Sequence, residues 1–232
     1  MVSTRSTAPR LSALWHSSIG KKIAMAATGL IMLAYLLVHM LGNLKIFFGR
    51  ADFDHYAAWL RTIGTPALRH GWFLWVVRVI LVVAVVIHAV AAYQLSRRDQ
   101  RARPVKYASR RPAEVTFATR TMRWGGAILA LFVIWHVLDL TVGATNPDFQ
   151  HGEVYGNVVA DFTHWWPNVI YIVAMLALGL HIHHGFWSAA QTLGITDPVR
   201  DRVIKIAGST LAVVISGGFV IVPIAVMTGI TR

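Results

Sequence analysis

Five long apolar segments, separated by polar and charged stretches, dominate the hydropathy pattern of this chain. They cover residues 22–44, 72–95, 119–143, 167–191 and 206–228. Each is long enough to supply the roughly 20 residues that an α-helix needs to cross the hydrocarbon core of a bilayer. A backbone in contact with lipid must form its hydrogen bonds within one segment, which favours helix. The pattern predicts an all-α membrane protein with five transmembrane helices in a single domain, residues 1–232.

Composition agrees with this prediction and excludes several kinds of chemistry. The chain is 56% hydrophobic and 14% charged, whereas soluble domains carry about 25% charged residues. It contains no cysteine, so it has no thiolate to ligate an iron–sulfur cluster or to attach c-type haem. It also lacks a Walker loop and a glycine-rich dinucleotide fingerprint. Chemistry that needs FAD or iron–sulfur clusters must therefore reside on other subunits.

The net charge of +12 is distributed unevenly along the chain. Lysine and arginine concentrate before the first apolar segment, between the second and third, and between the fourth and fifth, while residues 144–166 contain neither. By the positive-inside rule, the N-terminus is cytoplasmic and the C-terminus lies outside. Topology explains the positive charge, so we expect no nucleic-acid partner. The basic loop after the second helix is also a candidate contact for a cytoplasmic partner or anionic membrane lipid.

Histidines lie inside the first four apolar segments and are absent from the fifth. The positions are His39 in the first, His88 in the second, His136 in the third, and His181, His183 and His184 in the fourth. An ionisable residue inside a membrane is expensive and marks a functional site by default. Histidines on four consecutive helices are a stronger signal than one alone.

Depth sorts these histidines into two layers. At a rise of about 1.5 Å per residue, His39 and His136 lie roughly 25 Å from the cytoplasmic edge. On the helices that run in the opposite direction, His88 and His181 lie roughly 14 Å from that edge. We therefore expect His39 to pair with His136 in an outer layer, and His88 to pair with His181 in an inner one.

Two imidazoles at one depth on facing helices suit a b-type haem, whose iron takes two axial ligands. Ligation also removes the penalty of burying an unsatisfied imidazole. The pattern predicts two stacked b-type haems in a bundle of the first four helices, with the fifth helix peripheral. His184 lies on nearly the same helix face as His181, so spacing alone leaves either as the inner ligand. Interhelical hydrogen bonds or a proton relay are the alternative roles for such histidines.

Several stretches carry a family resemblance that covers nearly the whole chain. They are His16-Ser17 before the first helix, LLVHMLGN, VVIHAVAAY, FVIWHV and HIHHGFWSAAQTLGIT. With them the chain resembles the cytochrome b membrane-anchor subunit of bacterial succinate:quinone oxidoreductase, respiratory complex II. The type is the single-chain, five-helix, dihaem form that is also found in quinol:fumarate reductases. In that family the ligand on the fourth helix is followed four residues later by glycine and then two aromatic residues. His181 fits this pattern through Gly185, Phe186 and Trp187, and His184 does not.

The resemblance implies a function in the tricarboxylic acid cycle at the bacterial cytoplasmic membrane. Such an anchor binds a cytoplasmic flavoprotein and an iron–sulfur protein, and passes electrons between iron–sulfur clusters and quinone, either menaquinone or ubiquinone. It is an electron-transfer subunit with no catalytic residues for succinate. Candidate contacts to quinone or to haem propionates are His16, Ser17, Asp52, Asp54, Asp139 and His184. Three alternatives remain: a dihaem cytochrome b of a hydrogenase or formate dehydrogenase, a histidine-relay transporter without haem, and a haem-free structural anchor.

Overall fold

The computed structural model describes residues 15–102, 113–195 and 197–231, and every regular element in these ranges is a helix. Five are long: α2 (Ser18–Leu44), α4 (Trp72–Arg101), α5 (Ala113–Val137), α7 (Trp165–Thr192) and α8 (Pro198–Met227). Four are short: η1 (Lys45–Phe48), α3 (Arg50–Thr62), the π-helical turn η2 (Leu138–Val142) and α6 (Val154–Thr163). The N-terminal basic residues before 15 and the basic stretch 103–112 lie outside the described residues.

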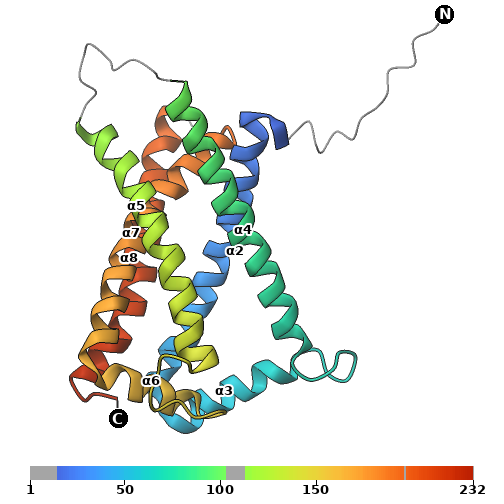
Figure 1. The fold of residues 1–232 in the computed structure, drawn as a ribbon, viewed down its shortest axis with the longest axis vertical. Helices are drawn as coiled ribbons and strands as arrows, with labels where there is room; N and C mark the ends of the chain where they lie inside the picture. The colour runs from blue at the N-terminus through green and yellow to red at the C-terminus, as the bar shows by residue number, and fades with distance from the viewer. Residues whose placement is uncertain (1–14, 103–112, 196, 232) are drawn as a thin grey trace, which may run out of the picture.

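The five long helices confirm the predicted all-α fold. Each is long and apolar enough to cross a membrane, and together they form an elongated bundle (Figure 1). Large apolar side chains such as Leu131 and Val213 are exposed on the outside of the bundle, as expected for helices that face lipid rather than water. Capping residues set several helix ends beyond the apolar segments. Asp197, for example, accepts hydrogen bonds from the backbone of Val199 and Arg200, so that α8 begins at Pro198.

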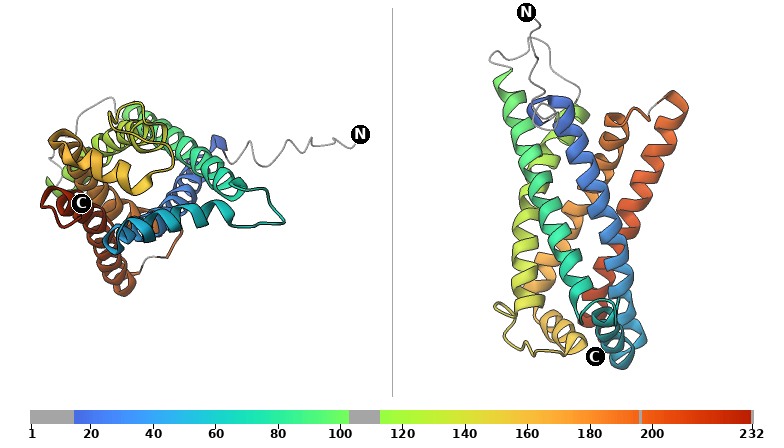
Figure 2. Two further views of the ribbon diagram at one scale, coloured as in Figure 1. Left: turned by 90° about the horizontal axis from the view of Figure 1, so that it is seen from below. Right: turned by 90° about the vertical axis from the view of Figure 1, so that its right-hand side faces the viewer.

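Packing between the long helices fixes which of them face each other. The main contacts join α7 with α8 and α5, and α2 with α4, α7 and α8. In the bundle of α2, α4, α5 and α7, α2 therefore lies diagonally opposite α5, and α4 diagonally opposite α7. The remaining helix, α8, packs against α7 and α2, away from α4 (Figure 2). Side chains on α2 and α5, or on α4 and α7, can therefore meet in the interior of this bundle.

Two short helices, α3 and α6, cover the end of the bundle at which α8 finishes (Figure 1). The hydropathy pattern did not predict them. Their apolar side chains, including Phe53, Tyr155 and Phe162, form a buried cluster with Tyr171 of α7 and Val222 of α8.

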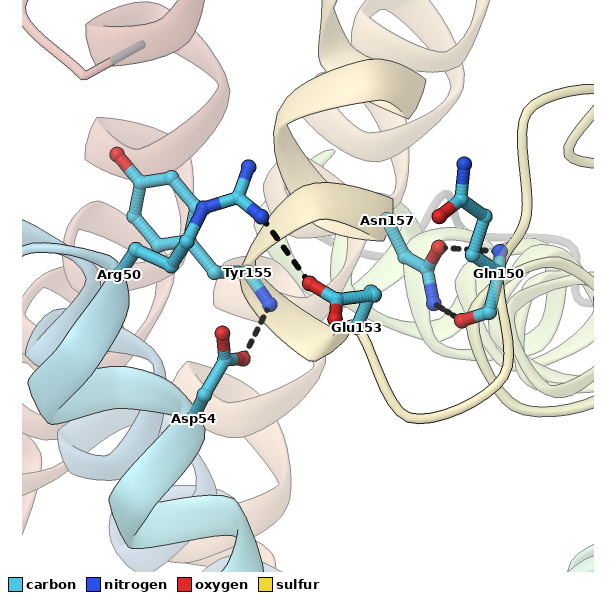
Figure 3. Close-up of polar contacts among 6 residues, drawn as sticks. All are labelled: Arg50, Asp54, Gln150, Glu153, Tyr155 and Asn157. Atoms are coloured by element: carbon cyan, nitrogen blue, oxygen red, sulfur yellow. Dashed lines mark hydrogen bonds and ion pairs between the residues drawn. The ribbon is translucent and has the colours of Figure 1, made fainter.

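Polar contacts hold these two helices together (Figure 3). Arg50 lies 3.0 Å from Glu153, and the carboxylate of Asp54 accepts a hydrogen bond of 2.9 Å from the backbone N–H of Tyr155. The loop before α6 is fixed by Asn157, whose amide bonds to both backbone groups of Gln150. The two short helices are therefore an ordered cap over this end of the bundle.

Candidate functional site

The four predicted ligand histidines lie in the bundle interior as two pairs. The ring centroids of His39 on α2 and His136 on α5 are 6.1 Å apart, with the ring planes at 78°. The ring centroids of His88 on α4 and His181 on α7 are also 6.1 Å apart, with the planes at 58°. Both pairs join diagonally opposite helices. They are the pairs that depth in the membrane predicts.

This spacing can be compared with the haem iron that the resemblance implies. A metal–imidazole nitrogen bond is about 2.0 Å long, so two imidazoles that would share one metal ion have ring centroids roughly 6 Å apart when their nitrogens face each other. Both observed separations are compatible with this arrangement, and they also lie within the range of about 4.5–7 Å of ordinary contacts between rings. The donor set and its spacing therefore fit a bis-histidine haem.

The inner pair also has backbone beside its rings in place of side chains. A Cβ atom added at Gly29 of α2 would lie 3.4 Å from Cε1 of His88, and one added at Gly126 of α5 would lie 3.9 Å from Cε1 of His181. Glycine at these two positions therefore leaves room beside the rings of His88 and His181. In the sequence, the signal for Gly126 is the glycine pair in the stretch RWGGA.

Hydrogen bonds orient two of the four imidazoles. Nδ1 of His88 lies 3.0 Å from the carbonyl oxygen of Met25 and 3.4 Å from the hydroxyl of Thr28. A carbonyl only accepts, so Nδ1 carries the proton and Nε2 keeps its lone pair for a ligand. Nδ1 of His136 lies 2.8 Å from the hydroxyl of Tyr171. Histidines that bind metals commonly use their second nitrogen in this way.

Aromatic packing surrounds the outer pair. Tyr35 stacks on His39 with centroids 5.2 Å apart, and Phe219 of α8 lies 5.7 Å from the same ring. Phe132 stacks on His136 at 5.6 Å. These contacts exclude water from the imidazoles and hold their ring planes.

The other two histidines of α7 have different surroundings. Nδ1 of His183 lies 3.0 Å from the hydroxyl of Ser209 on α8, and His184 lies 4.8 Å from His183, ring to ring. The ring that lies opposite His88 is therefore that of His181, one of the two that spacing left open.

Two buried carboxyl groups lie near the outer pair. Asp139, in the π-helical turn after α5, and Asp161, in α6, have no solvent exposure. The hydroxyl of Thr145 donates to Asp139 at 2.9 Å, and the carboxyl groups of Asp139 and Asp161 lie within hydrogen-bond reach of each other. Burial, together with the neighbouring carboxylate of Asp139, raises the pKa of Asp161 to about 8. Tyr171 lies close to both carboxyl groups and joins them to His136.

Asp161 is a residue that the sequence analysis missed. The available signal was an acidic residue inside the apolar stretch VVADF, within a loop that has no lysine or arginine to pair with it. Asp139 was a candidate, but nothing in the sequence places the two together, because α6 must fold back against α5 and α7 to bring Asp161 to it.

The remaining quinone and propionate candidates have structural contacts. Asp52 lies 2.6 Å from the ammonium group of Lys45, and Asp54 holds the first turn of α6 (Figure 3). The hydroxyl of Ser17 caps α2 by accepting from the backbone of Gly20. The carbonyl of His16 accepts a hydrogen bond of 2.9 Å from Arg98. A role in binding quinone or propionate stays a prediction for these residues.

Comparison of the chain with protein-family models, curated proteins and solved structures found no match. Function must therefore be inferred from the histidine pairs, the acid pair and the charge distribution. The histidine pairs are the most specific of these features, because few ligands require two imidazoles at one depth, twice.

Proposed function

We propose that this chain is a dihaem cytochrome b that conducts electrons across a membrane. His39 and His136 would hold an outer haem, and His88 and His181 an inner one. The observation that carries the proposal is the 6.1 Å separation in both pairs, each between diagonally opposite helices. A bound haem supplies one-electron redox chemistry at a potential that its ligands and surroundings set.

The residues around each pair prepare it for this role. The carbonyl oxygen of Met25 fixes the tautomer of His88 by accepting a hydrogen bond from its Nδ1–H group. The hydroxyl of Tyr171 forms a hydrogen bond with Nδ1 of His136. Tyr35 and Phe219 hold the ring of His39. Such contacts keep the ligands from rotating and, with the low dielectric around them, tune the potential of a bound haem.

Within this proposal, the chain is the membrane anchor of a succinate:quinone oxidoreductase. A cytoplasmic flavoprotein and an iron–sulfur protein would bind the side of the chain that carries the basic loop after the second spanning helix. Quinone in the membrane would exchange electrons with the chain. The absence of cysteine is consistent with iron–sulfur clusters on a separate subunit. If quinone reacts on the outer side, each electron that crosses the membrane couples the reaction to the potential by about 2.3 kcal/mol per 100 mV.

The acid pair gives the outer side a source of protons. Asp139 and Asp161 are buried, and neither forms an ion pair with a described basic residue. A proton bound to Asp161 lowers the negative charge of the two carboxyl groups from two to one. Quinone chemistry takes up or releases protons together with electrons. We assign this proton exchange at an outer quinone site to the two aspartates, with Tyr171 between them and the outer histidine pair.

The test is the visible spectrum of the purified protein after reduction by dithionite, with the haem content measured per chain. We expect two b-type haems. His39→Ala or His136→Ala should remove the outer haem, and His88→Ala or His181→Ala the inner one. His184→Ala is the matched control and should retain both.

A folded preparation without haem would contradict the proposal and favour a relay transporter or a bare anchor. Loss of a haem in His184→Ala, with retention in His181→Ala, would contradict the ligand assignment alone. The co-purifying subunits separate complex II from the cytochrome b of a hydrogenase or formate dehydrogenase.

A further inference from the structure

Lys21, at the beginning of α2, is buried although it carries a charge. Only 6% of its surface is exposed. No ion pair of its ammonium group is found among the described residues, and this group is not one of the side-chain nitrogens that are fully buried without a partner. A cation near a helix N-terminus also opposes the helix dipole, so this lysine does not stabilise α2. Its ammonium group is therefore available to an anion in the pocket that Lys21 lines.

The side chain of Lys21 lines a pocket of about 300 Å³ between α2 and α4. The other lining residues, all on α4, are Tyr93, Gln94, Arg97, Arg98 and Arg101. Arg98 is partly satisfied, because it donates to the hydroxyl of Ser18 and the carbonyl of His16. Asp99 is the acidic residue on this part of α4, and it does not line the pocket. Four cations therefore share one pocket without a described carboxylate.

None of the paired histidines lines the pocket. Arg97 follows His88 by nine residues, which is about two and a half helical turns, so the two side chains leave α4 in opposite directions. His88 points toward His181 in the interior. The pocket is therefore separate from the paired histidines.

An apolar face of α4 continues from the pocket toward the middle of the membrane. Val86, Val90, Tyr93 and Arg97 follow each other at intervals of four, three and four residues, so they lie on one face of the helix. The first three are exposed large hydrophobic residues. Tyrosine at this depth is typical of the membrane interface. From the middle of the membrane to its edge, this face of α4 presents apolar, then aromatic, then cationic side chains. These match the acyl chains, the glycerol and the phosphate of a lipid in the same order.

We propose that this pocket binds the phosphate group of an anionic phospholipid from the cytoplasmic leaflet. Lys21 and Arg97 contact the phosphate, and the acyl chains lie along Val90 and Val86. A soluble protein partner would leave the apolar part of this face uncovered. Basic pockets between membrane helices on the cytoplasmic side are suited to such headgroups. The site does not depend on haem.

The experiment is native mass spectrometry of the full chain, purified with any subunits that accompany it. It is titrated with phosphatidylglycerol or with phosphatidylcholine of the same chain length, and the affinity for the first bound lipid is measured. We expect the wild type to prefer phosphatidylglycerol. Lys21→Gln should weaken phosphatidylglycerol binding about tenfold and leave phosphatidylcholine binding unchanged, while Lys21→Arg should retain the preference.

Arg123→Gln is the matched control, because Arg123 is an exposed cation near the corresponding end of α5 and lies outside the pocket. It should bind both lipids like the wild type. An equal loss in Arg123→Gln would show that diffuse positive charge attracts the lipid and would overturn the proposal. The proposal would equally be overturned by a wild type that does not distinguish the lipids, or by displacement of phosphatidylglycerol by inorganic phosphate alone.

Discussion

The close approach of α8 to α2 can be tested at two adjacent glycines. A Cβ atom added at Gly218 of α8 would overlap the sulfur of Met40 on α2 and lie 2.7 Å from its Cγ. Met40 is 3% exposed, so its side chain has little room to move away. A Cβ atom at Gly217 would meet nothing within 4 Å. Gly217→Ala is therefore the matched control for Gly218→Ala.

The expected magnitudes follow from two opposing effects. Alanine in place of glycine stabilises a helix interior by about 1 kcal/mol, and this gain applies to both variants. Overpacking a buried contact typically costs about 1–3 kcal/mol, and this penalty applies only to Gly218→Ala. We expect Gly217→Ala to be more stable than the wild type, and Gly218→Ala to be less stable than Gly217→Ala by about 1–3 kcal/mol.

The assay is reversible unfolding in mixed micelles with increasing SDS, followed by circular dichroism at the helix band. The difference in free energy of unfolding between Gly217→Ala and Gly218→Ala measures the contact with Met40, because the gain in helix propensity is the same in both variants. Since Met40 follows His39, we also expect Gly218→Ala to lower outer-haem occupancy more than inner. Equal stabilisation by the two substitutions would refute the close packing of α8 on α2.

Three further predictions concern aspartates with different surroundings. Because the pKa of Asp161 is raised from 3.8 to about 8, the folded chain binds more protons there than the unfolded chain between about pH 4 and pH 8. Stability should fall as pH rises through this range, and Asp161→Asn should remove most of that fall in SDS unfolding curves. Asp197→Ala removes the N-cap of α8 and should lower the free energy of unfolding by about 1 kcal/mol, with Asp197→Asn close to wild type. Asp52→Asn breaks a partly exposed ion pair with Lys45 and should change stability by less than about 1 kcal/mol, and by less still at high salt.

The five spanning helices were predictable because each depends on its own sequence. An apolar stretch of sufficient length must satisfy its backbone internally in lipid, so hydropathy alone locates it. The short helices α3 and α6 were not predictable in this way. Phe53 and Tyr155 are buried only because they meet each other and the end of α8, and Arg50 and Glu153 are far apart in the chain. Tertiary contacts, rather than local hydropathy, determine those helices.

The same contrast holds for the candidate site. A straight helix measures depth at a constant rise per residue, so the sequence is enough to place His39 level with His136 and His88 level with His181. It does not determine the direction in which a side chain points around the bundle axis. That direction depends on how α7 packs against α5 and α8, and it separates His181 from His184. The acid pair likewise requires the fold of α6, which brings Asp161 to Asp139.

The surroundings of His39 and His181 argue for a resident ligand over a proton relay, whereas His136 is hydrogen-bonded to Tyr171 beside the acid pair. A relay needs hydrogen-bonded groups that continue to water. His39 instead meets Tyr35 and Phe219 through ring contacts, and Nδ1 of His181 is buried without a hydrogen-bond partner among the described residues. Burying such a nitrogen without compensation is unfavourable. A metal bond to one nitrogen of each ring would stabilise the buried imidazoles, and the two rings of each pair, with centroids 6.1 Å apart, are close enough to share one metal ion.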